Sequence, residues 1–141
     1  MAVRKGLETA GLSVTLRNVR QASVDELQSH SLLVMGCSTW EDGALQRDFR
    51  DFLPRLGDMR LEGHEAAVFG PGSRNYSRFC KAVDVLELEL LNRGAHLAGP
   101  SLRVDGTGYS ARPQAAEWAC SLARSLGAST GAIPREQAPM I

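Results

Sequence analysis

Short apolar runs alternate with amphipathic helical segments, and this alternation limits the folds open to the chain more than any other feature. The runs 31–37 (Ser-Leu-Leu-Val-Met-Gly-Cys) and 65–69 (Glu-Ala-Ala-Val-Phe) are short and almost wholly apolar, which is typical of strands buried on both faces. Residues 45–56 and 79–93 place apolar side chains on one helical face. Strands that alternate with helices predict a parallel sheet with helices covering both faces.

The segments around this core continue the same alternation. Their periodicity and their turn residues predict one further strand on either side, a short helical turn and two outer helices. The order becomes α-β-(α)-β-α-β-α-β-α. The two outer helices are residues 1–10, ended by Gly11, and 113–127, with Pro113 in the first turn. The two strands are 12–17, an edge strand with one solvent-exposed face, and 95–104, which Gly99-Pro100 interrupts. The short helical turn begins with the capping box at 23–26.

The pattern fits one α/β domain over residues 1–127. A chain of 141 residues is long enough for one such core. From residue 128 onward the side chains are small, polar or proline, so we expect a flexible C-terminal tail over 128–141.

Charge and cysteine content narrow the class of protein. Lys and Arg number 16 and Asp and Glu number 16, so the net charge is zero. This balance excludes the broad basic field of a nucleic-acid binder. The three cysteines are widely spaced without a CxxC pair, and no apolar run is long enough for a membrane span. We therefore expect a reduced, soluble, cytoplasmic protein that binds neither nucleic acid nor membrane.

Two loops that follow the buried strands carry unusual residues. Loop 38–43 presents Trp40, and loop 70–77 presents Tyr76 after two glycines. In a parallel α/β sheet, ligands bind beyond the carboxyl ends of the strands. Two aromatic rings at one such edge can hold a flat ligand between them, although each ring taken alone is better explained by local packing.

The sequence around these loops resembles the flavodoxin family. The stretch GCSTWEDGALQRDF (36–49) is similar to the family loop that places a tryptophan against one face of FMN. The stretch VFGPGSRNYSRFCKAVD (68–84) is similar to the second flavin loop and the helix after it. The absence of a long insertion near 97–103 resembles the short-chain type.

The resemblance implies a fold, a cofactor and a function. It implies a flavodoxin-like doubly wound parallel sheet in the order 2-1-3-4-5. It also implies a monomeric carrier of single electrons between redox partners, a reductase or another oxidoreductase, with bound FMN and no substrate chemistry of its own. Trp40 and Tyr76 would flank the flavin ring, and Glu41 and Asp42 would disfavour the extra electron. The implied cofactor-binding residues are Ser38, Thr39, Trp40, Glu41, Asp42, Gly43, Gly70, Gly72, Ser73, Arg74, Asn75 and Tyr76.

One departure from the family pattern bears on the fold. The family begins with a strand and a Ser/Thr/Gly-rich loop that cradles the FMN phosphate, whereas this sequence begins in the helix that should follow them. We therefore expect the first, central strand to be missing. Either 12–17 then pairs directly with 31–37, or buried strand backbone stays unpaired, which is costly.

The same departure leaves three interpretations of function open. The chain is an FMN-binding carrier whose sequence starts upstream of Met1, or the flavin module of a larger reductase. Alternatively it is a remnant of the fold that binds FMN weakly or not at all and acts through protein contacts.

The remaining reactive side chains suggest no second site. His30, His64 and His96 are scattered along the sequence without metal-ligand spacing, and we interpret them as surface or packing residues. Cys37 and Cys80 are interpreted as small buried apolar residues. A Ser-based hydrolase site at Ser38 would require a GxSxG elbow, which the sequence lacks.

Overall fold

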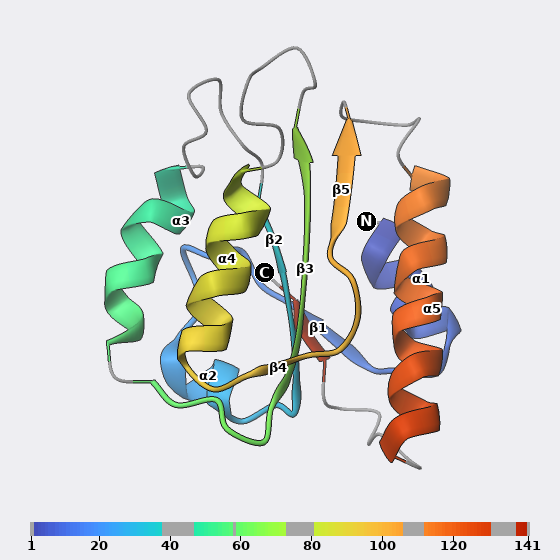
Figure 1. Ribbon diagram of the computed structural model, residues 1–141, viewed down its shortest axis with the longest axis horizontal. Helices are drawn as coiled ribbons and strands as arrows, with labels where there is room; N and C mark the ends of the chain where they lie inside the picture. Colours follow the sequence, from blue (N-terminus) through green and yellow to red (C-terminus); the bar gives the residue numbers. More distant parts are fainter. Residues whose placement is uncertain are drawn as a thin grey trace.

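The computed structural model describes residues 2–37, 47–57, 59–72, 81–105, 112–130 and 138–140. Helices and strands alternate along the chain as the sequence predicts, and Figure 1 shows their arrangement. The elements are α1 (Ala2–Thr9), β1 (Val14–Leu16), α2 (Val24–Gln28), β2 (Leu32–Gly36), α3 (Arg47–Phe52), the 3-10 helix η1 (Leu53–Leu56), β3 (Glu65–Gly72), α4 (Lys81–Asn92), β4 (His96–Leu97), β5 (Leu102–Asp105), α5 (Arg112–Thr130) and β6 (Ala138–Met140).

The strands form one parallel sheet that helices cover on both faces. The strand order is β1-β6-β2-β3, and β3 pairs on its other side with β4 and then with β5. Helices α3 and α4 lie to the left of the sheet in Figure 1, and α1 and α5 lie to the right. The prediction of a parallel sheet between two helical layers is confirmed.

Strand β2 shows why such a fold buries an uninterrupted apolar run. Leu33 and Met35 belong to the core cluster that includes α3 and α4, whereas Leu32 and Val34 belong to the cluster that includes α1 and α5. All four side chains are almost fully buried. Alternate residues of a strand point to opposite faces, so a central strand of a two-layered sheet needs apolar residues at every position.

Local signals in the sequence set the ends of the helices. Gly11 has a φ of +102°, and the Leu12 N–H bonds back to the Leu7 carbonyl, which closes α1. The Ser23 hydroxyl accepts the Glu26 N–H and caps α2. Pro54 converts the end of α3 into the 3-10 turn η1. The predicted capping residues are confirmed.

The position between β1 and β2 differs from both alternatives that the sequence suggested. We expected β1 to pair directly with β2 or the buried backbone to stay unpaired. Instead, Ala138–Met140 lies between them as β6, parallel to both. A buried gap in a sheet leaves main-chain groups without partners, so a segment of poor strand composition is still stabilised there.

The C-terminal region therefore differs from the expected flexible tail over 128–141. Helix α5 continues through Thr130, and Ala138–Met140 forms a strand. Composition favoured a tail because Pro139 and the small residues nearby have low strand propensity. Pairing with two apolar neighbours outweighs that propensity.

The residues 70–72 also differ from their interpretation as a loop. They extend β3, where Gly70, Pro71 and Gly72 pair with Arg103, Val104 and Asp105 of β5. The pairing of β2 with β3 reaches only to Phe69. Pro71 is tolerated because, within the described residues, β3 has a strand on one side only at that point.

In the described part of the chain, no helix is long and apolar enough to cross a membrane.

Candidate functional site

The carboxyl ends of β2 and β3 meet at one edge of the sheet. Gly36 pairs with Phe69 in the last step of the ladder, and the Cys37 N–H donates to the Phe69 carbonyl at 3.1 Å. Trp40 lies three residues after Cys37, which follows β2, and Tyr76 lies four residues after Gly72, the last residue of β3. The structure thus starts both loops from neighbouring strand ends, as a shared ligand site requires.

Two glycines allow the strands to approach closely at this edge. A Cβ added to Gly36 would collide with the Phe69 ring, and a Cβ added to Gly70 would collide with the Cys37 carbonyl oxygen. Gly70 was selected as a residue whose backbone approaches the cofactor. Its position shows a second requirement for glycine, the close passage of the Cys37 main chain.

The structure places only two of the predicted cofactor-binding residues, Gly70 and Gly72, both at the end of β3. The other ten lie outside the described residues, and their roles remain predictions. They are Ser38, Thr39, Trp40, Glu41, Asp42, Gly43, Ser73, Arg74, Asn75 and Tyr76.

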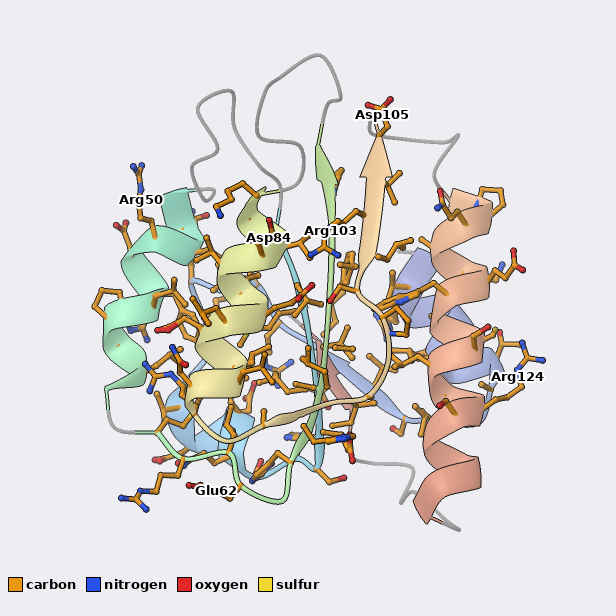
Figure 2. All side chains as sticks on the ribbon, in the orientation of Figure 1. Arg50, Glu62, Asp84, Arg103, Asp105 and Arg124 are labelled. Carbon is orange, nitrogen blue, oxygen red and sulfur yellow. The ribbon has the colours of Figure 1, made fainter. Side chains whose placement is uncertain are left out.

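A charged cluster lies beside the same edge, between β5 and the first turns of α4 (Figure 2). Arg103 donates to Asp84 at 2.5 Å and to Glu87 at 2.7 Å. Partial burial disfavours the Arg103 charge, but the two hydrogen bonds and carboxylate charges outweigh burial and raise the pKa of Arg103. The guanidinium therefore stays charged at any working pH and fixes the start of α4 against the sheet.

This cluster could not be predicted from the sequence. Asp84 and Glu87 are visible as an i, i+3 pair on a helix. Arg103 meets them only because its strand pairs with Gly70, which is a property of the sheet register.

The three histidines are neighbours rather than scattered. His30, His64 and His96 lie at the starts of β2, β3 and β4. The His64 ring Nδ1 bonds to the His30 carbonyl at 2.7 Å, and the His96 N–H donates to the His64 carbonyl at 3.0 Å. Parallel strands that begin at one edge bring such residues together, which their sequence spacing cannot show. Across the residues that the structure describes, no group of His, Cys, Asp or Glu could hold a metal ion. His30 and His64 are half-buried, and the exposed His96 has its Nδ1 2.8 Å from a carboxylate oxygen of Glu65.

A surface hollow of about 510 Å³ lies at the opposite edge of the sheet, between the end of η1 and the end of α4. Arg93 spans it, because its Nη1 donates to the Gly57 carbonyl at 2.6 Å and its Nη2 pairs with Glu89 at 3.5 Å. These contacts tie the end of α4 to the segment before β3. The hollow lies at the end of the sheet opposite the carboxyl ends of the strands, as the labels of Glu62 and Asp105 in Figure 2 show.

Cys37 and Trp118 occupy packed positions. Cys37 is buried, as predicted, and Cys80 lies outside the described residues. Trp118 of α5 packs its ring 5.7 Å from that of Phe69, and its Nε1 donates to the Pro100 carbonyl at 2.8 Å. Ala119 and Leu122 of the same helix are buried in the core cluster against which Trp118 packs.

This fold defines a class, the doubly wound α/β proteins, in which ligands bind beyond the carboxyl ends of the parallel strands. Comparison with known proteins identifies the family within that class. A family model described as flavodoxin matches residues 1–118. The chain belongs to the flavodoxin family.

Individual relatives agree with this assignment. The flavodoxin of Maridesulfovibrio salexigens is 36% identical over 127 residues, which cover 88% of this chain and 86% of that protein. The flavodoxin of Nitratidesulfovibrio vulgaris is 34% identical over the same length and coverage. Among solved structures, a flavodoxin from Streptococcus pneumoniae superposes with a TM-score of 0.80 at 26% identity, covering 92% of this chain and 87% of that one. Oxidised flavodoxin 2 from Bacillus cereus gives a TM-score of 0.80 at 28% identity, with coverage of 87% and 86%.

Proposed function

We propose that this protein binds FMN at the carboxyl edge of β2 and β3 and carries single electrons between redox proteins. Membership of the flavodoxin family supports the cofactor and the class of activity, since flavodoxins are electron-transfer proteins that bind FMN. One observation supports this location: the segments that carry Trp40 and Tyr76 follow the ends of two strands that pair with each other, β2 and β3.

The residues of the two loops suit the chemistry of a flavin. The rings of Trp40 and Tyr76 would pack against the flat isoalloxazine, and the main-chain groups of 38–43 and 70–75 would meet its polar edges. FMN supplies one-electron redox chemistry at these loops. The protein orients the ring, limits its contact with water and sets the charge around it through Glu41 and Asp42.

The close packing behind the loops supports an ordered site. Gly36, Gly70 and Phe69 leave no free volume between the strand ends, and Arg103 ties α4 to β5 beside them. Binding loops that are attached to packed strands and to a helix held in place are positioned more accurately than loops without such support.

The zero net charge bears on how the protein meets its partners. A protein with a strong overall charge steers its partners through a long-range field, whereas a neutral one depends on local patches. We propose that the redox partners dock on a local surface around the flavin loops.

The experiment that tests this function measures binding and electron transfer together. The purified chain is mixed with FMN, passed through ultrafiltration and then titrated anaerobically with reductant and with a one-electron acceptor such as ferric cytochrome c. We expect retained yellow colour and rapid transfer of electrons to the acceptor.

Matched variants show whether the two aromatic residues hold the cofactor. Trp40→Ala and Tyr76→Ala should each weaken FMN retention about tenfold, because each removes a stacking surface. Leu88→Ala, at an exposed position of α4, should have no effect. Retention of FMN that is equal in all four proteins would contradict the proposed site.

A further inference from the structure

Helix α4 is tied to the rest of the protein by a different arginine at each end. Near its start, Arg103 of β5 donates to Asp84 at 2.5 Å and to Glu87 at 2.7 Å. Near its end, Arg93 donates to the Gly57 carbonyl at 2.6 Å. Figure 2 shows Arg103 and Asp84 toward the end of the sheet at which β2 and β3 finish. Only the first of the two ties is therefore close to the proposed flavin loops.

Apolar packing alone leaves the first turn of α4 incompletely fixed. Ala82 and Val83 are fully buried, and the Val83 Cγ2 would lie 3.0 Å from a Cβ added to Gly70. This packing sets the distance between α4 and β3. The hydrophobic effect has no direction, however, whereas charge-assisted hydrogen bonds fix the orientation of the groups that they join. The two bonds from Arg103 therefore determine how the first turn is rotated and where it lies along the sheet.

Partial burial and a second partner make this contact stronger than a single surface ion pair. The Arg103 side chain is 33% exposed and that of Glu87 is 25% exposed. Isolated exposed pairs contribute little to stability, whereas networks of charges contribute measurably. The sheet places the guanidinium, because β5 pairs with β3 there and Arg103 lies opposite Gly70. Arg103 thus joins α4 to the end of β3 from which the Tyr76 segment continues.

The segment that carries Tyr76 is attached to these elements at both of its ends. It follows Gly72, the last residue of β3, and precedes Lys81, the first residue of α4. Only eight residues, 73–80, connect the two. The conformations open to a short connection are limited by the separation and orientation of its ends. A shift of the start of α4 therefore changes the conformations available to the Tyr76 segment.

From these contacts we propose that Arg103 is a positioning residue for FMN affinity. It acts without touching the cofactor. It holds the first turn of α4 through Asp84 and Glu87, and the helix in turn holds the Tyr76 segment in the arrangement that binds FMN. This inference rests on the proposed function and adds to it a residue that lies outside both flavin loops.

The test compares the dissociation constants of FMN, measured by quenching of flavin fluorescence, for the full chain and its variants. Arg103→Gln should raise the dissociation constant about threefold to tenfold, because the arrangement that binds FMN is then populated for a smaller fraction of the time. Arg103→Lys keeps the charge but loses the forked geometry of the guanidinium. Its dissociation constant should lie between those of the unchanged protein and Arg103→Gln.

Two further variants separate position from charge and from general stability. The double variant Arg103→Gln, Asp84→Asn keeps the summed charge of the three side chains unchanged, and it should bind FMN as weakly as Arg103→Gln does. Arg93→Gln removes the other tie of α4, at the end far from the flavin loops. It should bind FMN as the unchanged protein does.

A measurement without FMN follows the helix itself. In the FMN-free chain, NMR-detected hydrogen exchange of the Val85 amide should be about threefold faster or more in Arg103→Gln, because local opening of the first turn releases this amide. The Leu91 amide should respond to Arg93→Gln instead. An unchanged Val85 rate in Arg103→Gln would show that Arg103 does not hold the first turn, and would overturn the proposal.

Three further results would overturn the role of Arg103 while leaving the proposed function in place. One is an unchanged FMN dissociation constant in Arg103→Gln. Another is recovery of affinity in the double variant, which would assign the effect to charge. The third is equal weakening by Arg93→Gln, which would assign it to general stability. An unchanged protein that takes up no FMN would instead overturn the proposed function, and the role of Arg103 with it.

Discussion

At the scale of single residues, the site depends on where side chains are absent. Gly36 and Gly70 end neighbouring strands at points where a Cβ has no room, one against the Phe69 ring and the other against the Cys37 carbonyl. The sequence predicts Gly70 as a cofactor-binding residue, and the structure adds a packing requirement for glycine there. A glycine that admits a ligand and a glycine that admits a neighbouring strand look alike in a sequence. Only the register of β2 and β3 distinguishes the two.

Substituting Gly70 tests the packing of these strand ends. Gly70→Ala should lower the free energy of unfolding by about 1–3 kcal/mol, because a main-chain oxygen cannot rotate away from the new methyl group. Urea denaturation measures the change. Gly99→Ala is the matched control, since the nearest atom to a Cβ added there is the Leu122 Cδ1 at 3.9 Å. Its free energy of unfolding should stay within about 0.5 kcal/mol of that of the unchanged protein. Equal stability of the two variants would show that the strand ends are looser than described.

The acidic residue Glu41 gives a prediction about the proposed cofactor. Two unit charges about 10 Å apart, at an effective dielectric constant of about 20, have an interaction energy of roughly 1.7 kcal/mol. Removing one negative charge near the flavin makes its reduction easier, so Glu41→Gln should raise the reduction potential by tens of millivolts. Spectroelectrochemistry measures this shift, and Glu62→Gln, at the opposite edge of the sheet, should leave the potential unchanged. A potential that does not move in Glu41→Gln would place that side chain far from the flavin.

At the scale of elements, the helices and the buried strands were predictable, and the exceptions have physical causes. Apolar periodicity and capping residues located α1, α2 and α4 because those signals act within a few residues of the chain. The end of β3 and the strand β6 were missed, since Pro71 and Pro139 have low strand propensity. Both are stabilised by partners that lie far away in the sequence.

The contact between α1 and α5 illustrates such a long-range determinant. A Cβ added to Gly6 would lie 2.6 Å from the Ala116 carbonyl oxygen and 2.8 Å from the Ala119 Cβ. Alanine has the higher intrinsic helix propensity, by about 1 kcal/mol, but the helices would have to separate to admit it.

We therefore expect Gly6→Ala to lower the melting temperature despite its better propensity. Differential scanning calorimetry measures the change, and a drop of several degrees is expected for about 1–2 kcal/mol. Lys5→Ala, at the neighbouring exposed position, serves as the control and should be close to neutral. A Gly6→Ala protein that melts higher than the unchanged protein would mean that the helices are not in close contact.

At the scale of the whole molecule, the described residues pair more extensively between β2 and β3 than between β2 and β6. Strands β2 and β3 pair at five positions, whereas β6 meets β2 at one among the described residues. The sequence could not predict this asymmetry, because the segment that completes the centre comes from the end of the chain with the least strand-like composition. Family resemblance predicted the layers and the place of the aromatic loops but not the occupant of the central position.

Hydrogen exchange tests this division of the sheet. The amides of Leu33, Val34 and Met35 should exchange close to the rate of global unfolding, whereas those of Ala138 and Met140 should exchange faster through local opening. The expected difference is at least tenfold, and NMR-detected exchange resolves it residue by residue. Equal protection of β6 and β2 would show that the central strand is as firmly held as its neighbours.

The proposed site holds FMN between the loops that follow β2 and β3. Titrating FMN with the purified chain and following flavin fluorescence tests this most directly, because stacking against tryptophan and tyrosine quenches the emission. We predict saturable quenching at one FMN per chain. Flavin that stays fully fluorescent in the presence of excess folded protein would contradict the account.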